Sequence, residues 1–287
     1  MTDIMINSRI WHADTVLRNG KVLISGGQDE NVQILHTAEL YHALARNWTR
    51  VPNMWFKRIW HTSTLLRNGN VLVVGGSSDE FIPTNSCELY DPEKNSWTMT
   101  GSMHHTRSQH TAFLLNNGKV LVIGGSSVVD NFNSSELYDP LTGKWTLTTS
   151  MNYPRMYHAA IVLKNGKVLV AGGWQPDYGE LNTAELYDPS TEVWTLTGNM
   201  NQQRSSPTIS LLNNGKVLVA GADLGSLYSS NSTELYDPLT GNWTNTANMN
   251  FPRTTNTQTT LKNGKVLVAG GCGNGYDFYN SAELYTP

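Results

Sequence analysis

The sequence predicts an all-β protein built from six copies of one four-stranded repeat. A stretch of the form Asn-Gly-Lys-Val-Leu-Val-Ala-Gly-Gly recurs along the 287 residues, and neighbouring copies are 48 or 49 residues apart. A near-constant period of this size is typical of an array of supersecondary units. No position in the repeat shows helical periodicity. The six copies end at Gly27, Gly76, Gly125, Gly173, Ala222 and Gly271.

The first half of each repeat predicts a connector followed by a β-hairpin. In the fourth copy the connector covers 151–155 and contains a proline. An apolar first strand rich in β-branched residues is expected over 156–163. The Asn-Gly pair at 165–166 then predicts a tight hairpin turn, because both residue types accept a positive φ. The second strand covers 167–171 and ends at a pair of glycines.

The second half of each repeat predicts a loop and two further strands. The loop of the fourth copy covers 174–182, and its sequence differs from copy to copy. A third strand is expected over 183–187. An Asp-Pro turn follows, with proline at a favoured position. The fourth strand covers 193–197 and contains Trp194.

Four short strands joined by tight turns form one twisted antiparallel sheet, which buries little surface by itself. Six such sheets stacked radially as blades form a β-propeller, which removes long exposed strand edges. We therefore expect a single domain over residues 1–287, with repeats that start near residues 5, 54, 103, 151, 200 and 249. A recurring tyrosine and a recurring tryptophan are expected to pack the blades together. They are Tyr41, Tyr90, Tyr138, Tyr187, Tyr236 and Tyr285 in the third strands, and Trp48, Trp97, Trp145, Trp194 and Trp243 in the fourth.

The sixth copy ends before its fourth strand. The chain stops at Pro287, where a turn and a tryptophan strand follow in the other copies. Met5 aligns with Met151, and the residues before Met5 are too few for a full strand. We therefore expect a three-stranded sixth blade with an exposed edge near residues 282–285. A longer parent protein, a fragment or a truncated gene model would each account for this.

The repeats resemble the kelch family. Each copy combines the glycine pair with a Tyr-Asp-Pro turn and a tryptophan about six residues further on, and the resemblance covers essentially the whole chain. It implies a six-bladed kelch β-propeller of four-stranded antiparallel blades, with the sixth blade lacking its outer strand. The sequence motifs NGKVLVxGG and AELYDP are also similar to the repeats of galactose-oxidase-type propellers. The fifth copy has Gly221-Ala222 in place of the glycine pair, which leaves its local turn open.

The composition argues against several classes of function. A formal net charge of −3 gives no general electrostatic case for binding nucleic acid or an anionic membrane. No apolar run is long enough to cross a membrane. Cys87 and Cys272 form no disulfide or metal pattern, so we expect small buried or half-buried thiols. No signal peptide is recognisable. The chain is expected to be cytoplasmic if it is complete, and a secreted protein is the alternative if its N-terminus is truncated.

Alternate connections of an antiparallel sheet lie on opposite faces. The uniform Asn-Gly and Asp-Pro turns share one face, and the connectors and the loops after Gly-Gly share the other, which we call the variable face. Aromatic residues outside the recurring Tyr and Trp positions gather on the variable face, with the exception of Phe113. Tyr and Trp on variable loops are typical of a recognition surface. They are Trp11, Trp55, Trp60, Tyr153, Tyr157, Trp174, Tyr178, Tyr228, Tyr276 and Tyr279.

The loops after Gly-Gly also predict an acidic rim. They contain no Lys or Arg, whereas the lysines that begin the second strands lie near the opposite face. Uncompensated carboxylates favour a basic or hydroxyl-rich partner. The acidic residues are Asp29, Glu30, Asp79, Glu80, Asp130, Asp177, Glu180, Asp223 and Asp277.

Two sets of polar residues recur near the first strands. An arginine in every connector and a glutamate in every third strand indicate structural pairing, and an arginine ring that binds a carboxylate is the alternative. Three residues after the arginine, four copies have a histidine. These histidines could fill the central channel, contact a ligand or bind a metal if they converge. The sets are Arg9, Arg58, Arg107, Arg155, Arg204 and Arg253; Glu39, Glu88, Glu136, Glu185, Glu234 and Glu283; and His12, His61, His110 and His158, with Pro207 and Asn256 in the last two copies.

One segment resembles a copper site. The run Arg155-Met156-Tyr157-His158 is similar to the galactose-oxidase segment in which an adjacent Tyr and His bind copper. The resemblance also implies a cysteine-crosslinked tyrosine and a further histidine, and we assign neither in this chain. No His-Glu-x-x-His, phosphate-loop or Gly-x-Ser-x-Gly motif is present.

The predicted function is non-catalytic recognition of a protein, a peptide or a glycan on the variable face. No cofactor, metal or catalytic residue is assigned. Two alternatives stay open, a galactose-oxidase-like copper enzyme and a structural or adhesive repeat segment of a larger protein. The residues expected to contact the ligand are Trp60, His61, Arg107, Arg155, Tyr157, His158, Trp174, Tyr178, Tyr228 and Tyr276.

Overall fold

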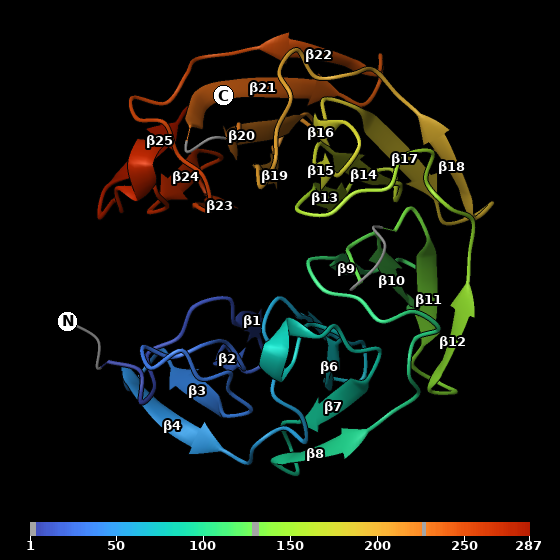
Figure 1. Ribbon diagram of the computed structural model, residues 1–287, viewed down its shortest axis with the longest axis vertical. Helices are drawn as coiled ribbons and strands as arrows, with labels where there is room; N and C mark the ends of the chain where they lie inside the picture. Colours follow the sequence, from blue (N-terminus) through green and yellow to red (C-terminus); the bar gives the residue numbers. More distant parts are fainter. Residues whose placement is uncertain (1–3, 128–131, 226–227) are drawn as a thin grey trace. The chain divides into compact units, whose positions relative to one another are not determined.

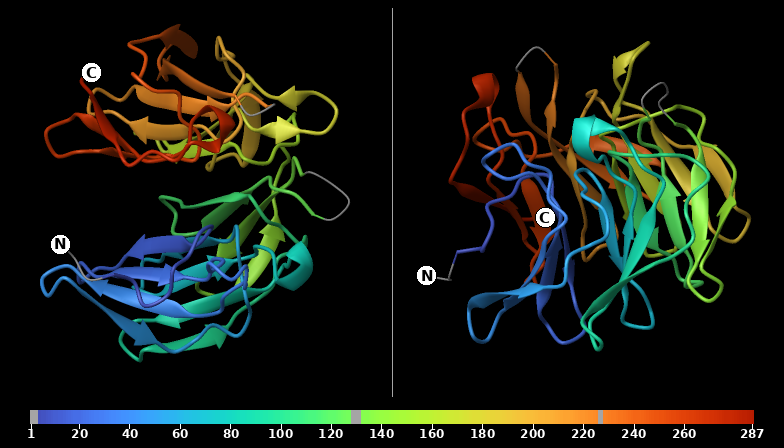
Figure 2. Two further views of the ribbon diagram at one scale, coloured as in Figure 1. Left: turned by 60° about the vertical axis from the view of Figure 1, so that its left-hand side comes forward. Right: turned by 60° about the horizontal axis from the view of Figure 1, so that its bottom comes forward.

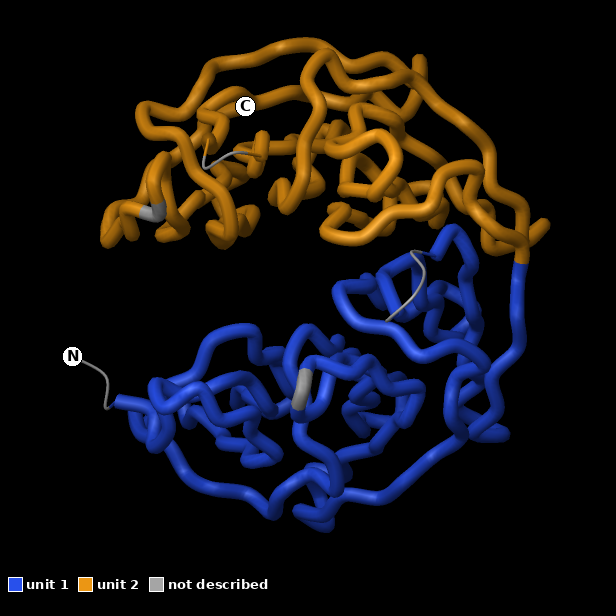
Figure 3. Tube along the Cα trace, in the orientation of Figure 1, with its two compact units in different colours: residues 1–148 blue, residues 149–287 orange. Residues whose placement is uncertain are grey.

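A computed structural model describes residues 4–127, 132–225 and 228–287, apart from the side chains of Glu80 and Tyr276. The chain divides into two compact units, residues 1–148 and 149–287 (Figure 3). The boundary falls between the third and fourth repeats, so that each unit contains three blades. The single domain expected over residues 1–287 stays a prediction. In the described residues no helix is long and apolar enough to cross a membrane.

Unit 1 contains three antiparallel sheets of four strands each, and in every sheet the strands pair in chain order. The first blade contains β1 (Ala13–Val16), β2 (Val22–Ser25), β3 (Ala38–His42) and β4 (Asn47–Val51). The second contains β5 (Thr62–Leu65), β6 (Val71–Val74), the 3-10 turn η1 (Asp79–Phe81), β7 (Cys87–Asp91) and β8 (Ser96–Met99). The third contains β9 (Thr111–Leu114), β10 (Val120–Ile123), β11 (Ser135–Asp139) and β12 (Lys144–Leu147).

Unit 2 contains two further blades of four strands and one of three. The fourth blade contains β13 (Ala159–Val162), β14 (Val168–Ala171), β17 (Ala184–Asp188) and β18 (Val193–Leu196), with the small hairpin β15 (Trp174–Gln175) and β16 (Gly179–Glu180) in its loop. The fifth contains β19 (Thr208–Leu211), β20 (Val217–Asp223), β21 (Ser229–Asp237) and β22 (Asn242–Asn245). The sixth contains β23 (Thr257–Thr260), β24 (Val266–Ala269), the 3-10 turn η2 (Asn274–Tyr276) and β25 (Ala282–Tyr285).

These sheets are the blades of a six-bladed β-propeller, as the repeats predict. Within each unit the first strands of neighbouring blades contact one another, as β1 contacts β5 and β5 contacts β9. The fourth strands β4, β8 and β12 lie on the outside of unit 1 (Figure 1). The sixth blade has three strands, because β25 pairs only with β24 in the described part of the chain.

The core lies between the blades. The second strands β6, β10 and β14 are buried along their whole length, which explains their unbroken runs of valine, leucine and isoleucine. In each complete blade the recurring tyrosine and tryptophan stack, with ring centroids 4.9 to 5.1 Å apart. Cys87 and Cys272 are free and buried, as expected.

Two backbone details differ from expectation. The Asn-Gly hairpins form, but only the glycine has a positive φ; in the first hairpin Gly20 has φ +78° and donates its N–H to the Leu17 carbonyl at 2.9 Å. The first strands are also shorter than predicted. In the fourth blade β13 starts at Ala159 and not at Met156, because Tyr157 has φ +54° and its backbone leaves the strand conformation.

The second glycine of each pair packs against the connector of its own blade. At Gly76 φ is +88°, and an added Cβ would lie 2.5 Å from the Ile59 carbonyl oxygen. Ala222 in the fifth copy avoids this conflict because β20 runs on through it, with a β-bulge between Ala220 and Ala222. The missing glycine therefore replaces a turn with a longer hairpin.

Replacing Gly76 with alanine should destabilise unit 1 more than the same change at Gly20. Both glycines have a positive φ, but an added Cβ at Gly20 meets nothing within 4 Å. We expect a loss of about 1–2 kcal/mol for Gly20→Ala from backbone strain alone, and a clearly larger loss for Gly76→Ala. Chemical unfolding of the two variants measures the difference. Equal losses would show that the close approach at Gly76 is relieved without cost.

Candidate functional site

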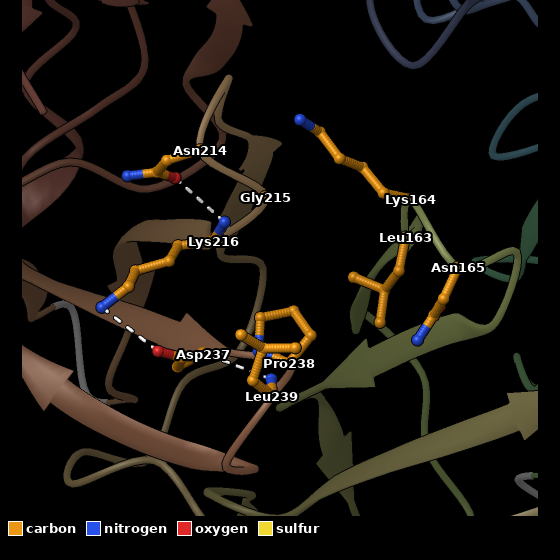
Figure 4. A pocket seen from close by; sticks show the side chains of 9 residues that line it. All are labelled: Leu163, Lys164, Asn165, Asn214, Gly215, Lys216, Asp237, Pro238 and Leu239. Atoms are coloured by element: carbon orange, nitrogen blue, oxygen red, sulfur yellow. Dashed lines mark hydrogen bonds and ion pairs between the residues drawn. The ribbon is translucent and has the colours of Figure 1, made fainter.

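The face of the Asn-Gly and Asp-Pro turns contains hollows that recur with the repeat. One hollow of about 260 Å³ lies between the turns of the fourth and fifth blades, where Lys216 pairs with Asp237 (Figure 4). A hollow of about 330 Å³ occupies the equivalent position between the first and second blades. The lining positions correspond one to one, from Leu163 and Leu17 onwards. Such a hollow is therefore a product of blade packing, and the features that differ between repeats lie on the variable face.

On the variable face each connector is fixed to the loop that follows the glycine pair of its own blade. Ile10 pairs with Gln28 in the first blade, Ile59 pairs with Ser77 in the second, and Met156 pairs with Trp174 in the fourth. The side chains of connector and loop are therefore presented together.

One position of every connector has a left-handed backbone. The residue two places after the arginine has φ between +50° and +58° in all six copies, although none of these residues is a glycine or an asparagine. Its backbone joins neighbouring blades: the Trp60 N–H donates to the Trp11 carbonyl at 3.2 Å, and the Gln109 N–H donates to the Trp60 carbonyl at 3.1 Å. The six residues are Trp11, Trp60, Gln109, Tyr157, Ser206 and Thr255.

In unit 1 this geometry builds a stack of three exposed aromatic rings. Trp11 and Trp60 have ring centroids 4.8 Å apart, and Phe81 of η1 lies 5.7 Å from Trp60. Trp11 is 43% exposed and Phe81 is 50% exposed, while Trp60 is half-buried between them. We call these three rings the aromatic surface. Of the three, only Trp60 was among the residues expected to contact a ligand.

Exposed aliphatic side chains adjoin two of the rings in the sequence, because Ile10 precedes Trp11 and Ile82 follows Phe81, and Val32 stands on the first-blade loop. Ile10, Val32 and Ile82 are all exposed. The acidic rim is weaker here than the sequence suggests, because Asp79 pairs with Lys57 of the connector at 3.0 Å. Asp29 accepts hydrogen bonds from two backbone N–H groups of its own loop and thereby shapes the loop. This part of the variable face therefore combines exposed apolar side chains with carboxylates that are largely paired.

Unit 2 presents a second group of predicted residues. Tyr178 lies at the tip of the β15–β16 hairpin, which projects from the rest of the unit (Figure 2), and Tyr228 lies at the tip of the β20–β21 hairpin. Both rings are largely exposed. Tyr157 is 36% exposed, and Trp174 of β15 is half-buried beside the same connector.

Some predicted positions cannot be placed. Asp130 lies outside the described residues, and the side chains of Glu80 and Tyr276 are not described. Asp223 accepts the Gly225 N–H at 2.9 Å and organises the turn of its hairpin.

The recurring arginines and glutamates form one network per blade, which is buried in the first five blades and partly exposed in the sixth. In the fourth blade Arg155 donates through Nη1 to the carbonyls of Gly172 at 2.6 Å and Thr183 at 3.0 Å, and through Nη2 to Glu185 at 2.9 Å. Glu185 in turn accepts the backbone N–H groups of Asn152 and Tyr153 at 2.8 and 3.1 Å. Each network thus ties the connector to the second and third strands.

In the third blade the network also favours the ionised form of Glu136. Burial alone would raise the pKa of Glu136, but the His104 N–H and the Arg107 charge outweigh burial and lower it. Arg107 and Arg155 are fully buried, with an exposed fraction of 0%. The structure thus places these two predicted contact residues inside the blades and not on the variable face.

The histidines are buried as well. His61 is 6% exposed, bonds to Ser25 of the preceding blade at 3.1 Å, and packs closely against Gly26. Burial lowers the pKa of His61 well below its ordinary value. His158 is also 6% exposed, and burial, helped by the Arg155 charge, lowers its pKa to about 3. Both imidazoles are therefore neutral near pH 7.

The residues around Tyr157 and His158 do not fit a copper centre. In the described part of the chain no three His, Cys, Asp or Glu side chains gather as a metal site. Cys272 lies in the sixth blade, where its Sγ contacts the Thr255 hydroxyl at 3.7 Å. Within the described ranges, the Tyr157–His158 pair is therefore not joined by a group of imidazole, thiol or carboxylate donors of the kind that copper binds.

Comparison with known proteins agrees with the blade architecture. Residues 11–221, which cover most of the chain, match the family model of the KLHDC2/KLHL20/DRC7 Kelch-repeats domain. The chain belongs to the kelch-repeat family. The family resemblance of the glycine pair, Tyr-Asp-Pro turn and tryptophan is thereby confirmed. No curated protein matches this kelch chain.

Two solved structures are similar to this kelch protein. The first is a fungal alcohol oxidase of the AA5 family in complex with copper, with 20% identity and a TM-score of 0.80 over 98% of this chain. The kelch chain spans 63% of that enzyme's length. The second is YjhT, with 17% identity and a TM-score of 0.75 over 99% of this chain and 96% of YjhT. At these identities the likeness shows the fold alone.

Removing Glu185 should strongly destabilise unit 2. Glu185→Ala leaves Arg155 as a buried charge without its carboxylate, which typically costs about 3–5 kcal/mol. The matched control is Glu283→Ala in the sixth blade, where the side chain of the same pair is 14% exposed and water can reach it. We expect a smaller loss for the control in chemical unfolding. Similar small losses for both variants would mean that the network contributes little to stability.

The free energy of unfolding should also fall at acidic pH, because folding keeps His158 neutral. Its folded pKa of about 3 lies below the ordinary value of 6.5, so the contribution is complete above about pH 6.5 and is lost as the pH falls towards the folded pKa. The variant His158→Asn removes the imidazole and introduces asparagine, the residue type found at the equivalent position of the sixth repeat, Asn256. Between pH 7 and 5 the variant should lose about 2 kcal/mol less stability than the wild type. Parallel pH profiles of unfolding would contradict this.

Proposed function

We propose that this kelch protein is a recognition module that binds a polypeptide partner on the aromatic surface of Trp11, Trp60 and Phe81. The observation that supports this most directly is the exposed stack of three rings, built from two connectors and one loop of unit 1. Exposed aromatic rings at the centre of an apolar patch are typical of binding hot spots. Kelch-repeat domains commonly bind proteins.

The surroundings of the rings favour a polypeptide over a glycan. Exposed Ile10 and Ile82 lie next to Trp11 and Phe81 on the connector and the loop that present these rings, and they offer apolar contact but no hydrogen bonds to hydroxyl groups. The nearby Asp79 carboxylate is already paired with Lys57. A segment with apolar side chains therefore suits this surface best.

The left-handed backbone of Trp11 and Trp60 prepares the surface in advance. The left-handed conformation costs a non-glycine residue about 1–2 kcal/mol of conformational energy. The backbone hydrogen bond between Trp60 and Trp11 helps to stabilise this conformation. Rings held in place before binding lose little conformational freedom when the partner arrives. The exposed Tyr157, Tyr178 and Tyr228 and the half-buried Trp174 of unit 2 are proposed as further contacts for the same class of partner. Tyr276 stays a candidate on its sequence position alone.

Substitution of the two tryptophans tests the proposal. Peptides are selected from a random displayed library on the wild-type chain, and their affinities are measured for Trp11→Ser, Trp60→Ser and Leu141→Ser. Leu141 is 96% exposed but lies on an Asp-Pro turn, so it controls for the loss of any exposed apolar residue. We expect at least tenfold weaker binding for the tryptophan variants and no change for the control.

Two results would argue against the proposal. Selected peptides that bind all three variants equally would place recognition elsewhere. Glycan-array binding that is lost in the tryptophan variants, with no peptide selected, would assign the surface to a glycan. Thermal unfolding of each variant shows that its fold is retained.

A further inference from the structure

Seven asparagines of the chain are followed directly by glycine. In such a pair an asparagine readily loses its side-chain amide, because glycine leaves the attacking main-chain nitrogen unshielded and the backbone free to bend. Six of the pairs form the hairpin turns between the first and second strands, and the seventh is Asn274-Gly275 in η2 of the sixth blade. The hairpin pairs begin at Asn19, Asn68, Asn117, Asn165, Asn214 and Asn263.

Loss of the amide depends on the main-chain nitrogen that follows the asparagine. This nitrogen loses its proton and attacks the side-chain carbon Cγ, the bond from Cγ to Nδ2 breaks, and ammonia leaves. Water then opens the five-membered imide at one of its two carbonyls, which yields either aspartate or isoaspartate. Water is the only co-reactant, and no electrons are transferred. Because the first step removes the N–H proton, a hydrogen bond that already holds this N–H slows the reaction.

In every hairpin the glycine N–H is held by such a bond. The Gly20 N–H donates to the Leu17 carbonyl at 2.9 Å, and the Gly166 N–H donates to the Leu163 carbonyl at the same distance. The other four hairpin glycines make the equivalent bond at 2.9 or 3.0 Å. Attack by a hairpin glycine would therefore break the hydrogen bond that closes its turn.

The pair in η2 is held differently. Asn274 and Gly275 are both exposed, so that solvent reaches the two reacting groups. Among the hydrogen bonds described for this loop, none comes from the Gly275 N–H. Gly275 has φ +71°, and a Cβ added to it would meet nothing within 4 Å. The attacking nitrogen of this pair is therefore accessible in the folded chain.

The side-chain carbonyl of Asn274 is also prepared for attack. Its Oδ1 accepts the Ser229 N–H of the β20–β21 hairpin at 2.8 Å. A donor at this oxygen stabilises the negative charge that develops on it when Cγ is attacked. The hairpin asparagines have such a donor as well, as Asn19 accepts the Lys21 N–H at 3.1 Å. The difference between the pairs therefore lies in the attacking nitrogen.

We propose that Asn274-Gly275 is a site of spontaneous deamidation, at which the folded chain converts Asn274 to aspartate and isoaspartate while the hairpin pairs stay intact. The reaction changes the link between the loops of the fifth and sixth blades, which both belong to unit 2. Aspartate keeps an acceptor for the Ser229 N–H and adds a negative charge. Isoaspartate adds one carbon to the main chain and displaces the acceptor. The aromatic surface of unit 1 takes no part, so the site does not depend on the proposed function.

Ageing of the full chain in a mildly alkaline buffer, followed by peptide mapping with mass spectrometry, tests the proposal. We expect deamidation at Asn274 to be roughly tenfold faster than at any hairpin asparagine of the same chain. In denaturant all the Asn-Gly pairs should react at similar rates, because the difference arises from the fold. Hydrogen exchange at Ser229 should be faster in the isoaspartate fraction. The variant Asn274→Asp, which contains only the aspartate product, should keep the slow exchange.

Three results would overturn the proposal. Equal rates at Asn274 and at the hairpin asparagines of the folded chain would show that the hairpin bond gives no protection. Deamidation of Asn274 only after unfolding would show that η2 holds this residue in an unreactive conformation. Unchanged exchange at Ser229 in the isoaspartate fraction would show that the link between the two loops survives the reaction.

Discussion

The buried ion pair between the connector arginine and the third-strand glutamate is the interaction on which the rest of each blade depends. Two buried charges are costly unless each is fully satisfied. In the fourth blade Arg155 reaches the ends of the second and third strands while Glu185 holds the N–H groups of the connector. The irregular part of the repeat is therefore fixed as firmly as its strands, and the same arrangement recurs in every blade.

The network also reaches the neighbouring blade. The carbonyl of Arg58 accepts the N–H of Gly27 at 2.8 Å, and that of Arg204 accepts the N–H of Gly173 at 2.8 Å. Two residues after the arginine the chain turns left-handed and bonds to the same position of the preceding blade, as Trp60 does to Trp11. The positions that display side chains on the variable face are thus set by backbone contacts.

The repeat period predicts the strands, the stacked Tyr-Trp pairs and the three-stranded last blade, because these follow from residue types that recur at fixed spacing. It does not reveal the left-handed connector residues, since Trp and Tyr are not typical of that conformation. The contact between Trp11 and Trp60 joins residues one period apart and depends on this backbone. Phe81 becomes part of the surface only through the short turn η1.

For the arginines and histidines, the sequence suggested ligand contacts at positions that the structure places in the interior. Recurrence alone favours a structural role, and the burial of Arg107, Arg155, His61 and His158 agrees with that interpretation. They were expected to contact a ligand because they lie near the variable loops in the sequence. What separates the two roles is the direction of the side chain, and a linear pattern does not contain that direction.

The left-handed connector position has a consequence for how such proteins change. The six copies place Trp, Gln, Tyr, Ser and Thr on nearly the same backbone, so that one chain already demonstrates that the side chain there is interchangeable. Because backbone hydrogen bonds and the arginine–glutamate network fix the geometry of this position, its side chain can change without a change of fold. Randomising these codons within one unit would therefore vary the displayed side chains on a constant backbone.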